Sequence, residues 1–275
     1  MTSHVVRIGK LKIGAGQPLA VIAGPCVIES EAHAMKMAER LSATAKELRL
    51  PCIFKASYDK ANRTSLGSYR GPGLDRGLEI LARIKREFGI PLLTDVHRVE
   101  QVRPAAAVCD VLQIPAFLSR QTDLLVEVGR SGAVVNIKKG QFLSPWDIRH
   151  ALEKARSTGN DRILVTERGA SFGYNNLVVD IRGLAVMREF GAPVILDVTH
   201  SLQLPGGEGC RSGGQPQYIE TLARAGVAAG VDGVFLEVHD NPAKALSDGA
   251  NSLPLRSFKP LMTRLRELGT FVRKL

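Results

Sequence analysis

The feature that most constrains the fold is an eightfold alternation between short β-branched runs and longer segments of helical periodicity. The runs are bounded by turn residues and span Leu19 to Ala23, Cys52 to Ala56, Pro91 to Val96, Val111 to Ile114, Ala133 to Lys138, Arg162 to Thr166, Pro193 to Val198 and Gly233 to Val238. Between them, apolar residues recur at three- and four-residue spacing, as on the buried face of a helix. Such segments are Glu31 to Leu48, Leu74 to Phe88, Asp147 to Arg156, Leu177 to Phe190 and Gln217 to Ala229.

Parallel strands are joined by crossover helices, and strands covered on both faces read as continuous apolar runs, as residues 194–196 and 234–236 do. Eight such units favour a closed (β/α)8 barrel, with residues 1–275 as one catalytic domain. An open, doubly wound sheet remains the alternative, because periodicity does not report closure. Ahead of the first unit, residues 1–18 contain two short apolar runs around Gly9 and Lys10, which predict a hairpin that plugs one barrel end.

The composition fits a large aliphatic core, since 44% of the residues are hydrophobic and only 5% are aromatic. A formal charge of +10 admits nucleic acid, a membrane surface or small anions as partners. Neither a basic patch interleaved with aromatic residues nor an apolar run of the roughly 18 residues of a membrane span occurs, so nucleic acid and membrane are not expected as partners. The four cysteines, at positions 26, 52, 109 and 210, form no CxxC pair, and no signal peptide is evident, so we expect a cytoplasmic protein.

Most of the predicted strands end in polar or reactive side chains. The carboxyl ends of barrel strands form the catalytic face, so these side chains are expected around one pocket. They are Cys26, Lys55, Lys60, Arg63, Asp95, His97, Gln113, Lys138, Arg168, Asp197, His200, Glu237 and His239. Taken singly, an arginine there is more often solvated, and a cysteine is more often a small core residue. Several cations at one mouth repel each other unless anions bind, so the pocket is expected to hold more than one phosphate or carboxylate group.

Four residues on this face have metal-ligand chemistry. They are Cys26, His200, Glu237 and, beyond the last strand, Asp248. A thiolate, an imidazole and two carboxylates suit Zn²⁺, Fe²⁺ or Mn²⁺ better than Mg²⁺, which prefers oxygen ligands alone. Their wide spacing makes no local motif, so the alternative is that His200 caps a turn and Glu237 pairs with a lysine.

Five glycines fall between Pro205 and Gly214, directly after His200. A segment this permissive suggests a mobile lid or, equally, a disordered surface loop. Neither a P-loop nor a dinucleotide-binding glycine pattern occurs, so no nucleotide cofactor is expected.

Several motifs occur in order along the chain. The most specific is Phe-Lys-Ala-Ser-Tyr-Asp-Lys-Ala-Asn-Arg at 54–63, followed by Ser-Tyr-Arg-Gly at 68–71. The others lie at 113–117 with 120–123, at 136–142, at 166–169 with 172–174, and at 197–200. From about Val21 to Leu255, the chain resembles the 3-deoxy-D-manno-octulosonate 8-phosphate synthases.

The resemblance implies that phosphoenolpyruvate condenses with D-arabinose 5-phosphate, releasing inorganic phosphate, in the synthesis of the Kdo sugar of lipopolysaccharide. It places the phosphoenolpyruvate-binding cations at Lys60, Lys138 and Arg168, with Lys55 and Gln113 nearby. It places the arabinose 5-phosphate contacts at Asn62, Arg63 and Thr64, the last two reaching a neighbouring subunit's site in a homotetramer. The catalytic set it implies is Lys60, Asp95, His97, Lys138 and His200, with Asp95 and His97 placing the reacting groups.

The family has metal-dependent and metal-independent branches. Residues 23–26, Ala-Gly-Pro-Cys, resemble the metal-dependent branch, whose ligands map to Cys26, His200, Glu237 and Asp248. Two positions depart from the family pattern: Thr64 replaces a serine but keeps the hydroxyl, and Gly67 stands where histidine is common.

Three other functions serve as alternatives. A related synthase uses erythrose 4-phosphate, but its Lys-Pro-Arg-Thr motif is replaced here by Lys-Ala-Asn-Arg at 60–63. A Schiff-base aldolase would use Lys138 as a covalent nucleophile. A basic nucleic-acid binder would lose affinity steeply with salt.

Overall fold

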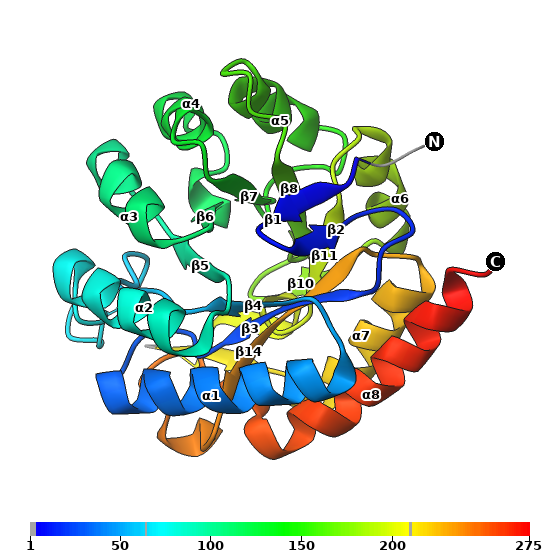
Figure 1. The fold of residues 1–275 in the computed structure, drawn as a ribbon. Helices are drawn as coiled ribbons and strands as arrows, with labels where there is room; N and C mark the ends of the chain where they lie inside the picture. Colours follow the sequence, from blue (N-terminus) through cyan, green and yellow to red (C-terminus); the bar gives the residue numbers. More distant parts are fainter. Residues whose placement is uncertain (1–3, 64, 209–210) are drawn as a thin grey trace.

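Eight parallel strands close into a barrel in the computed structural model, which describes residues 4–63, 65–208 and 211–275 (Figure 1). The strands are β3 (Ala20–Gly24), β4 (Cys52–Lys55), β5 (Leu92–Asp95), β6 (Val111–Ile114), β7 (Val134–Lys138), β8 (Ile163–Glu167), β11 (Val194–Asp197) and β14 (Gly233–His239). Each pairs with the next, and β14 pairs with both β11 and β3, which closes the ring. The predicted barrel is therefore confirmed and the open sheet is wrong, with strand bounds within about two residues of those expected.

The inward side chains of these strands form an apolar layer at the amino-terminal end of the barrel. Successive strand residues point to opposite faces, so every second residue faces the interior. This inner cluster contains Ala20, Ile22, Ile53, Leu93, Val111, Val134, Leu164, Ile195 and Phe235. The alternate residues face the surrounding helices and belong to a separate, larger core.

An antiparallel hairpin closes the apolar end. Its strands are β1 (Val6–Ile8) and β2 (Leu11–Ile13), and they lie across the barrel in Figure 1. Val6, Ile8 and Ile13 are buried in the same cluster as the inward strand residues. The predicted plug is confirmed, and its turn contains Gly9 at φ 57°, a conformation that favours glycine.

Eight α-helices surround the barrel among the described residues (Figure 1). They are α1 (Glu31–Leu48), α2 (Leu74–Phe88), α3 (Val102–Val108), α4 (Thr122–Arg130), α5 (Ile148–Arg156), α6 (Ile181–Glu189), α7 (Ile219–Ala228) and α8 (Leu255–Val272). The sequence predicts the bounds of α1 and α2 correctly. Ser30 fixes the start of α1, because its hydroxyl accepts the His33 backbone N–H.

The helix expected over Leu177 to Phe190 is shorter than predicted. Its first residues form β10 (Leu177–Val178), which pairs with β9 (Ala170–Ser171), and α6 begins only at Ile181. Asp180 sets this start, since its carboxylate accepts the backbone N–H of Arg182. The apolar periodicity continues on both sides of the Asp180 cap, so the sequence pattern overestimates the length of the helix.

The glycine-rich segment after His200 forms a β-ladder whose register shifts between Leu204 and Glu208. β12 (Gln203–Glu208) and β13 (Arg211–Gly214) form an antiparallel pair, and Gly206 has φ 66°. Cys210 lies outside the described residues. The remaining elements are β15 (Leu253–Pro254) and the 3-10 helices η1 (Val99–Gln101), η2 (Ala116–Leu118), η3 (His200–Leu202), η4 (Pro216–Tyr218), η5 (Pro242–Lys244) and η6 (Gly249–Asn251).

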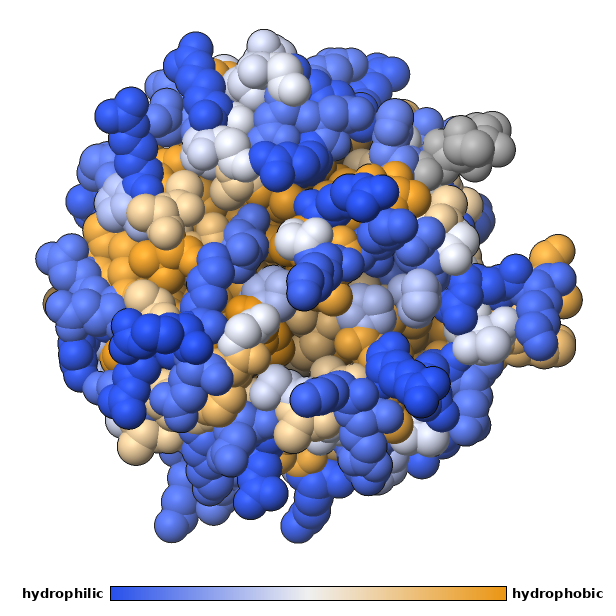
Figure 2. All heavy atoms as spheres, in the orientation of Figure 1, coloured by the Kyte–Doolittle hydropathy of each residue, from blue (hydrophilic) through white to orange (hydrophobic). Residues whose placement is uncertain are grey.

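Figure 2 shows the hairpin side of the molecule, with hydrophilic residues around the rim and hydrophobic residues visible between the outer helices. Among the described helices, none combines the length and the apolar composition that crossing a membrane requires.

Candidate active site

The inward positions above the apolar layer carry polar side chains. Two residues beyond Ile53, Leu93 and Ile195 stand Lys55, Asp95 and Asp197, and two beyond Phe235 stands Glu237. All four of these polar residues are buried. The period-2 geometry of the strands therefore directs them to the interior at the carboxyl end of the barrel, where the catalytic face was expected.

The first group of contacts centres on Cys26, which follows β3. Its Sγ lies 2.9 Å from Asp248 Oδ2 and 2.8 Å from Ser247 Oγ. Gly24 allows the approach of β3 to β4, because a Cβ there would overlap the Lys55 carbonyl oxygen. Asp248 has φ 50°, a left-handed conformation that is costly outside glycine, so the fold holds this carboxylate in place at the expense of local strain.

Glu237 links this group to the basic residues. Its Oε1 lies 3.6 Å from Lys55 Nζ, 3.7 Å from Lys60 Nζ and 3.3 Å from His200 Nε2. Both carboxylate oxygens are buried, and neither has a hydrogen-bond partner among the residues that the structure describes. One ligand atom each from Cys26, Glu237 and Asp248 lies within 4.8 Å of the other two.

A second group centres on Asp197 at the end of β11. Its Oδ2 lies 2.6 Å from Lys138 Nζ and 2.8 Å from His200 Nδ1. The Lys138 ammonium also lies 4.4 Å from the centre of the Phe235 ring, the floor formed by the apolar layer. Asp197 therefore orients both a lysine and the imidazole that faces Glu237.

A third group joins β4 to β5. Ser57 Oγ donates to Asp95 Oδ1 at 2.5 Å, and Lys55 Nζ donates to Ser57 Oγ at 2.9 Å. His97 Nε2 lies 3.3 Å from Asp95 Oδ2. Asp95 thus holds His97 at the rim, where its side chain is partly exposed.

Neutral polar groups line the opposite wall. Thr166 donates to the side-chain carbonyl of Asn136 at 2.7 Å, and the Asn136 amide donates to Gln113 Oε1 at 3.0 Å. Arg168 Nη2 donates to Gln203 Oε1 at 2.8 Å. Its Nη1 is buried and has no hydrogen-bond partner within the described chain, so the guanidinium keeps a free donor.

The electrostatics of the pocket follow from burial and close pairing. Burial raises the pKa of the Cys26 thiol well above its ordinary value. Burial also lowers the pKa of Lys138 and of Arg168, because it disfavours their charged forms. Burial opposes the charge on Lys60 too, yet its acidic neighbours raise the pKa of Lys60 well above the ordinary value. Likewise Lys55 and His97 outweigh burial and hold the pKa of Asp95 well below its usual range.

The structure brings together most of the residues predicted for the site. Cys26, Lys55, Lys60, Asp95, His97, Gln113, Lys138, Arg168, His200, Glu237 and Asp248 belong to the contact groups described above. The expected arabinose 5-phosphate residues lie at the edge. Asn62 and Gly67 are exposed, Arg63 Nη1 lies 3.8 Å from Asp248 Oδ1, and Thr64 is outside the described residues.

Sequence reasoning missed several supporting residues. Ser57, Asn136 and Thr166 occupy buried positions on or directly after barrel strands, and the two-residue period would have identified the last two as inward-facing. Ser247 carries no such signal, because it lies in an irregular connection between η5 and η6. Of the cysteines, Cys26, Cys52 and Cys109 are free thiols in the described part of the chain.

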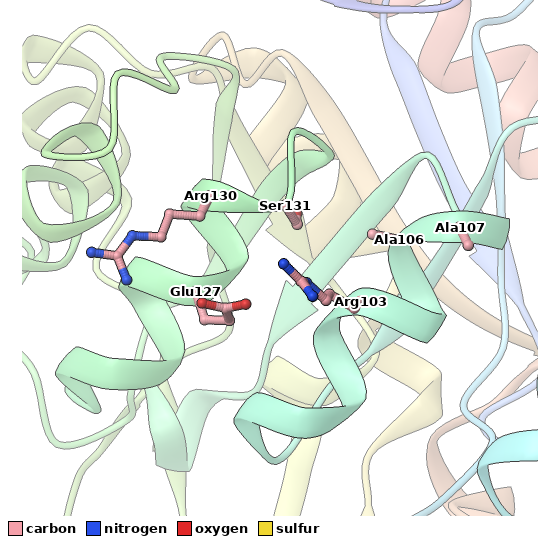
Figure 3. Close-up of a pocket in the computed structure, with 6 residues that line it drawn as sticks. All are labelled: Arg103, Ala106, Ala107, Glu127, Arg130 and Ser131. Carbon is pink, nitrogen blue, oxygen red and sulfur yellow. The ribbon is translucent and has the colours of Figure 1, made fainter.

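A groove on the helical shell is a different kind of feature (Figure 3). It lies between α3 and α4 and is lined by Arg103, Ala106, Ala107, Glu127, Arg130 and Ser131. Arg103 and Glu127 point toward each other across it, whereas Arg130 points away. These lining residues include no thiol, imidazole or lysine, so the strand tips hold the candidate active site.

Comparison with known proteins places this geometry in a family. Residues 3–273 match the DAHP synthetase I family. The chain belongs to that family. It is 58% identical over 268 residues to a 2-dehydro-3-deoxyphosphooctonate aldolase of Geobacter metallireducens, covering 98% of each chain. It is 59% identical over 273 residues to the enzyme of that name from Pelobacter propionicus, covering 99% of this chain and all of the relative. A third relative of the same name, from Geobacter sulfurreducens, is 55% identical over 268 residues, 98% of each chain.

The chain is thus a (β/α)8-barrel enzyme of the DAHP synthetase I family, and enzymes of this fold hold their active sites at the carboxyl end of the barrel. The family assignment covers almost the whole chain, and the residues that meet at the strand tips come from all eight barrel units or their connections.

Proposed function

We propose that this protein condenses phosphoenolpyruvate with D-arabinose 5-phosphate and water to give 3-deoxy-D-manno-octulosonate 8-phosphate and inorganic phosphate, in Kdo synthesis for lipopolysaccharide. The observation that carries the proposal is the 55–59% identity over nearly the full length to proteins named 2-dehydro-3-deoxyphosphooctonate aldolase. The alternative is the related condensation with erythrose 4-phosphate. We place the reaction in the cytoplasm and treat the whole chain as one catalytic domain.

Anion binding is the first task of the pocket. Lys60, Lys138 and Arg168 would neutralise the phosphate and carboxylate of phosphoenolpyruvate, with Lys55 and Gln113 beside them. Asp197 supports this role because it fixes the Lys138 ammonium at 2.6 Å, and Gln203 fixes one side of the Arg168 guanidinium at 2.8 Å. The free Nη1 of Arg168 is a buried donor without a partner in the described chain, as an anion site requires.

The reaction joins and breaks defined bonds. The methylene carbon of phosphoenolpyruvate forms a bond to the aldehyde carbon of the sugar, whose oxygen takes up a proton. Water adds to C2, where positive charge develops, and phosphate leaves with cleavage of the C–O bond to give the keto acid. Fixed cations allow two anionic substrates to occupy adjacent positions, so positioning and electrostatic stabilisation supply much of the rate. Asp95 and His97 would place the reacting groups, with Asn62, Arg63 and Thr64 at the sugar phosphate.

A phosphate-release assay tests the proposal. Purified protein is incubated with phosphoenolpyruvate and either arabinose 5-phosphate or erythrose 4-phosphate, and inorganic phosphate is measured. Faster release with arabinose 5-phosphate is expected. Preference for erythrose 4-phosphate would favour the alternative, and no release with either sugar under metal-supplied conditions would refute both.

We infer that the enzyme uses a divalent metal held by Cys26, His200, Glu237 and Asp248. The fit rests on the close approach of three of these ligand groups and on the two buried Glu237 oxygens that lack hydrogen-bond partners within the described residues. His200 presents Nε2 to Glu237, while Asp197 contacts its Nδ1, the arrangement of a metal-bound histidine oriented by a carboxylate. The set of sulfur, nitrogen and oxygen donors suits Zn²⁺, Fe²⁺ or Mn²⁺. Such an ion would supply Lewis-acid chemistry to the aldehyde or to the attacking water.

Chelation provides the corresponding test. Removing metal with a chelator should abolish phosphate release, and adding back Zn²⁺, Fe²⁺ or Mn²⁺ separately should restore it to different extents. Full activity in protein shown by elemental analysis to contain no metal would place it in the metal-independent branch, while leaving the condensation itself intact.

A Schiff-base aldolase is the second candidate, because burial lowers the pKa of Lys138, as a nucleophilic lysine requires. The ion pair with Asp197 at 2.6 Å opposes it by holding the ammonium form. Borohydride trapping with each substrate decides the question: a covalent adduct on Lys138 would support the aldolase, and unmodified protein would exclude it.

A homotetramer is also part of the proposal. Large apolar side chains are exposed in the connections after β6, β7 and β8, which are neighbours in the barrel. They are Phe117, Phe142, Trp146, Phe172 and Tyr174. Exposed apolar groups gathered on one side of a protein typically mark an interface. Light scattering should give the mass of four chains for the native protein, and a smaller mass after the double substitution Trp146→Ser and Phe172→Ser.

A further inference from the structure

A second cluster of ligand-type side chains lies beside the active site and takes no part in the mechanism above. It joins Glu29 after β3, His33 in the first turn of α1, and His239 at the end of β14. One ligand atom from each lies within 4.8 Å of the other two. The centres of the two imidazole rings are 4.6 Å apart.

One carboxylate lies beside both imidazoles. Asp240 Oδ1 lies 3.2 Å from His33 Nε2 and 3.3 Å from His239 Nδ1. The opposite nitrogens, His33 Nδ1 and His239 Nε2, are buried and have no hydrogen-bond partner among residues 4–63, 65–208 and 211–275. His239 is only 5% exposed, and its Nε2 faces Glu29 Oε1 at 3.3 Å. Each ring thus turns one nitrogen toward Asp240 and leaves the other without a hydrogen-bond partner, an orientation that suits a metal-bound histidine.

We propose that Glu29, His33 and His239 form a second metal site, which binds a divalent transition-metal ion such as Zn²⁺. Two imidazoles and one carboxylate are a common ligand set for Zn²⁺, with water completing the coordination. Mg²⁺ and Ca²⁺ do not fit this set, since both prefer oxygen ligands. The inference rests on these residues alone and is independent of the proposed condensation.

The position of the cluster indicates what the ion would do. Glu29 and His33 belong to the first barrel unit and His239 to the last. The ion would therefore link these two units where β14 pairs with β3. The backbone N–H of Leu246 donates to Glu29 Oε1 at 2.7 Å. Leu246 directly precedes Ser247 and Asp248, so an ion at this cluster would also steady the connection that carries them to Cys26.

Binding would require a proton shift at His239. Its Nδ1 accepts the backbone N–H of Asn241 at 2.9 Å, which places the ring proton on Nε2. Ligation through Nε2 moves this proton to Nδ1, which then loses the hydrogen bond from Asn241 and donates one to Asp240 Oδ1 instead. The ion therefore selects the Nδ1–H tautomer.

The test counts zinc in protein that lacks the active-site ligands. Cys26→Ala combined with Asp248→Ala removes two groups of that site, and equilibrium dialysis against Zn²⁺ followed by elemental analysis measures what remains. We expect about one zinc ion per chain, and almost none after the further change His33→Ala. Zinc at a hundredfold excess over its dissociation constant should raise the melting temperature by roughly 5 °C only when His33 is present.

His150→Ala in the same background is the matched control, because His150 is an exposed helical histidine beside a glutamate, Glu153. It should leave zinc binding unchanged. Cobalt provides a second readout: the wild type should show thiolate-to-cobalt absorption from Cys26, and the double variant should bind Co²⁺ without it. No zinc in the double variant, or zinc that persists after His33→Ala, would overturn the proposal whatever the outcome of the phosphate-release assay.

Discussion

The two ends of the barrel interior are built from the same strands, but one end is lined by apolar side chains and the other by charged ones. At the amino-terminal end, Ile53 and Ile195 pack with the hairpin residue Ile13 in a buried apolar layer. Two residues further along the same strands, Lys55 and Asp197 face a crowded set of charges. The two ends of each strand thus have different roles. The closed end stabilises the fold through apolar burial, whereas the open end holds buried charges that serve the reaction and lower stability.

The largest effect of a substitution is expected at Lys138, at the open end of the barrel. Lys138→Ala should lower kcat/KM by about a thousandfold, because it removes a fixed cation from the developing charge and takes the ammonium partner from Asp197. Phosphate release measures the change. Lys10→Ala, at the exposed hairpin turn of the opposite end, is the control and should retain wild-type activity. Equal losses in the two variants would contradict the division between the ends.

Cys26→Ala should come next, with a loss of roughly a hundredfold or more in kcat/KM, since even residues that only orient metal ligands cost about 10–100-fold when replaced. Elemental analysis should show less metal bound at the active site. Cys52→Ala is the control and should retain both metal and activity. Cys52 is also a buried thiol, and burial raises its pKa to about 12, but its side chain packs within the aliphatic core away from the site. Retained metal and activity in Cys26→Ala would remove this residue from the ligand set.

Ile13→Ala tests the closed end. The side chain is fully buried under the barrel, so its truncation should lower the free energy of unfolding by about 3 kcal/mol through lost apolar burial and a residual cavity. Urea denaturation measures the loss, and kcat should be unchanged well below the melting temperature. Lys12→Ala, on the exposed face of the same strand, should be nearly neutral. A fall in kcat without a fall in stability would show that the hairpin belongs to the catalytic end.

The smallest expected effect is pH-dependent and concerns Asp95. Its pKa is lowered in the folded protein, so its carboxylate contributes stability above the unfolded-state pKa of about 3.9, and that contribution is lost as the pH falls toward the folded value. Asp95→Asn should therefore cost about 2 kcal/mol at pH 7, with a difference from wild type that shrinks below about pH 4. Denaturation at pH 7, 5 and 3.5 would show this trend, and a difference that grows in acid would contradict it.

Sequence patterns predicted the barrel well because each unit repeats the same physical requirement, an apolar strand followed by an amphipathic helix. The α6 start was wrong because Leu177 continues the apolar spacing even though it pairs with Ser171 in a short ladder. The site was predictable where it follows strand ends, as for Lys55, Asp95 and Glu237. Cys26 and Asp248 are 222 residues apart, so no local spacing could join them. Their residue types and places beyond strand ends made them candidate ligands, and the family resemblance supported the pairing.

Other features depend on loop conformation, which periodicity does not encode. Ser247 reaches Cys26 only because the connection after β14 folds back over the strand tips. His33 looks like an ordinary polar residue in an amphipathic helix, and its proximity to His239 follows from the pairing of the first and last barrel units. The role expected for Arg63 at a neighbouring subunit stays a prediction, and in one chain this side chain lies near Asp248.

The pairing of β14 with β3 sets an order of events during protein synthesis. At roughly 5–20 residues per second, the ribosome releases Cys26 long before the strand that carries Glu237 exists. Until β14 pairs with β3, Cys26, Lys55 and Lys60 lack their carboxylate neighbours Glu237 and Asp248. A nascent chain that stops before Gly233 would lack Glu237 and Asp248 altogether, so the pocket can assemble only after the chain has been made through Asp248.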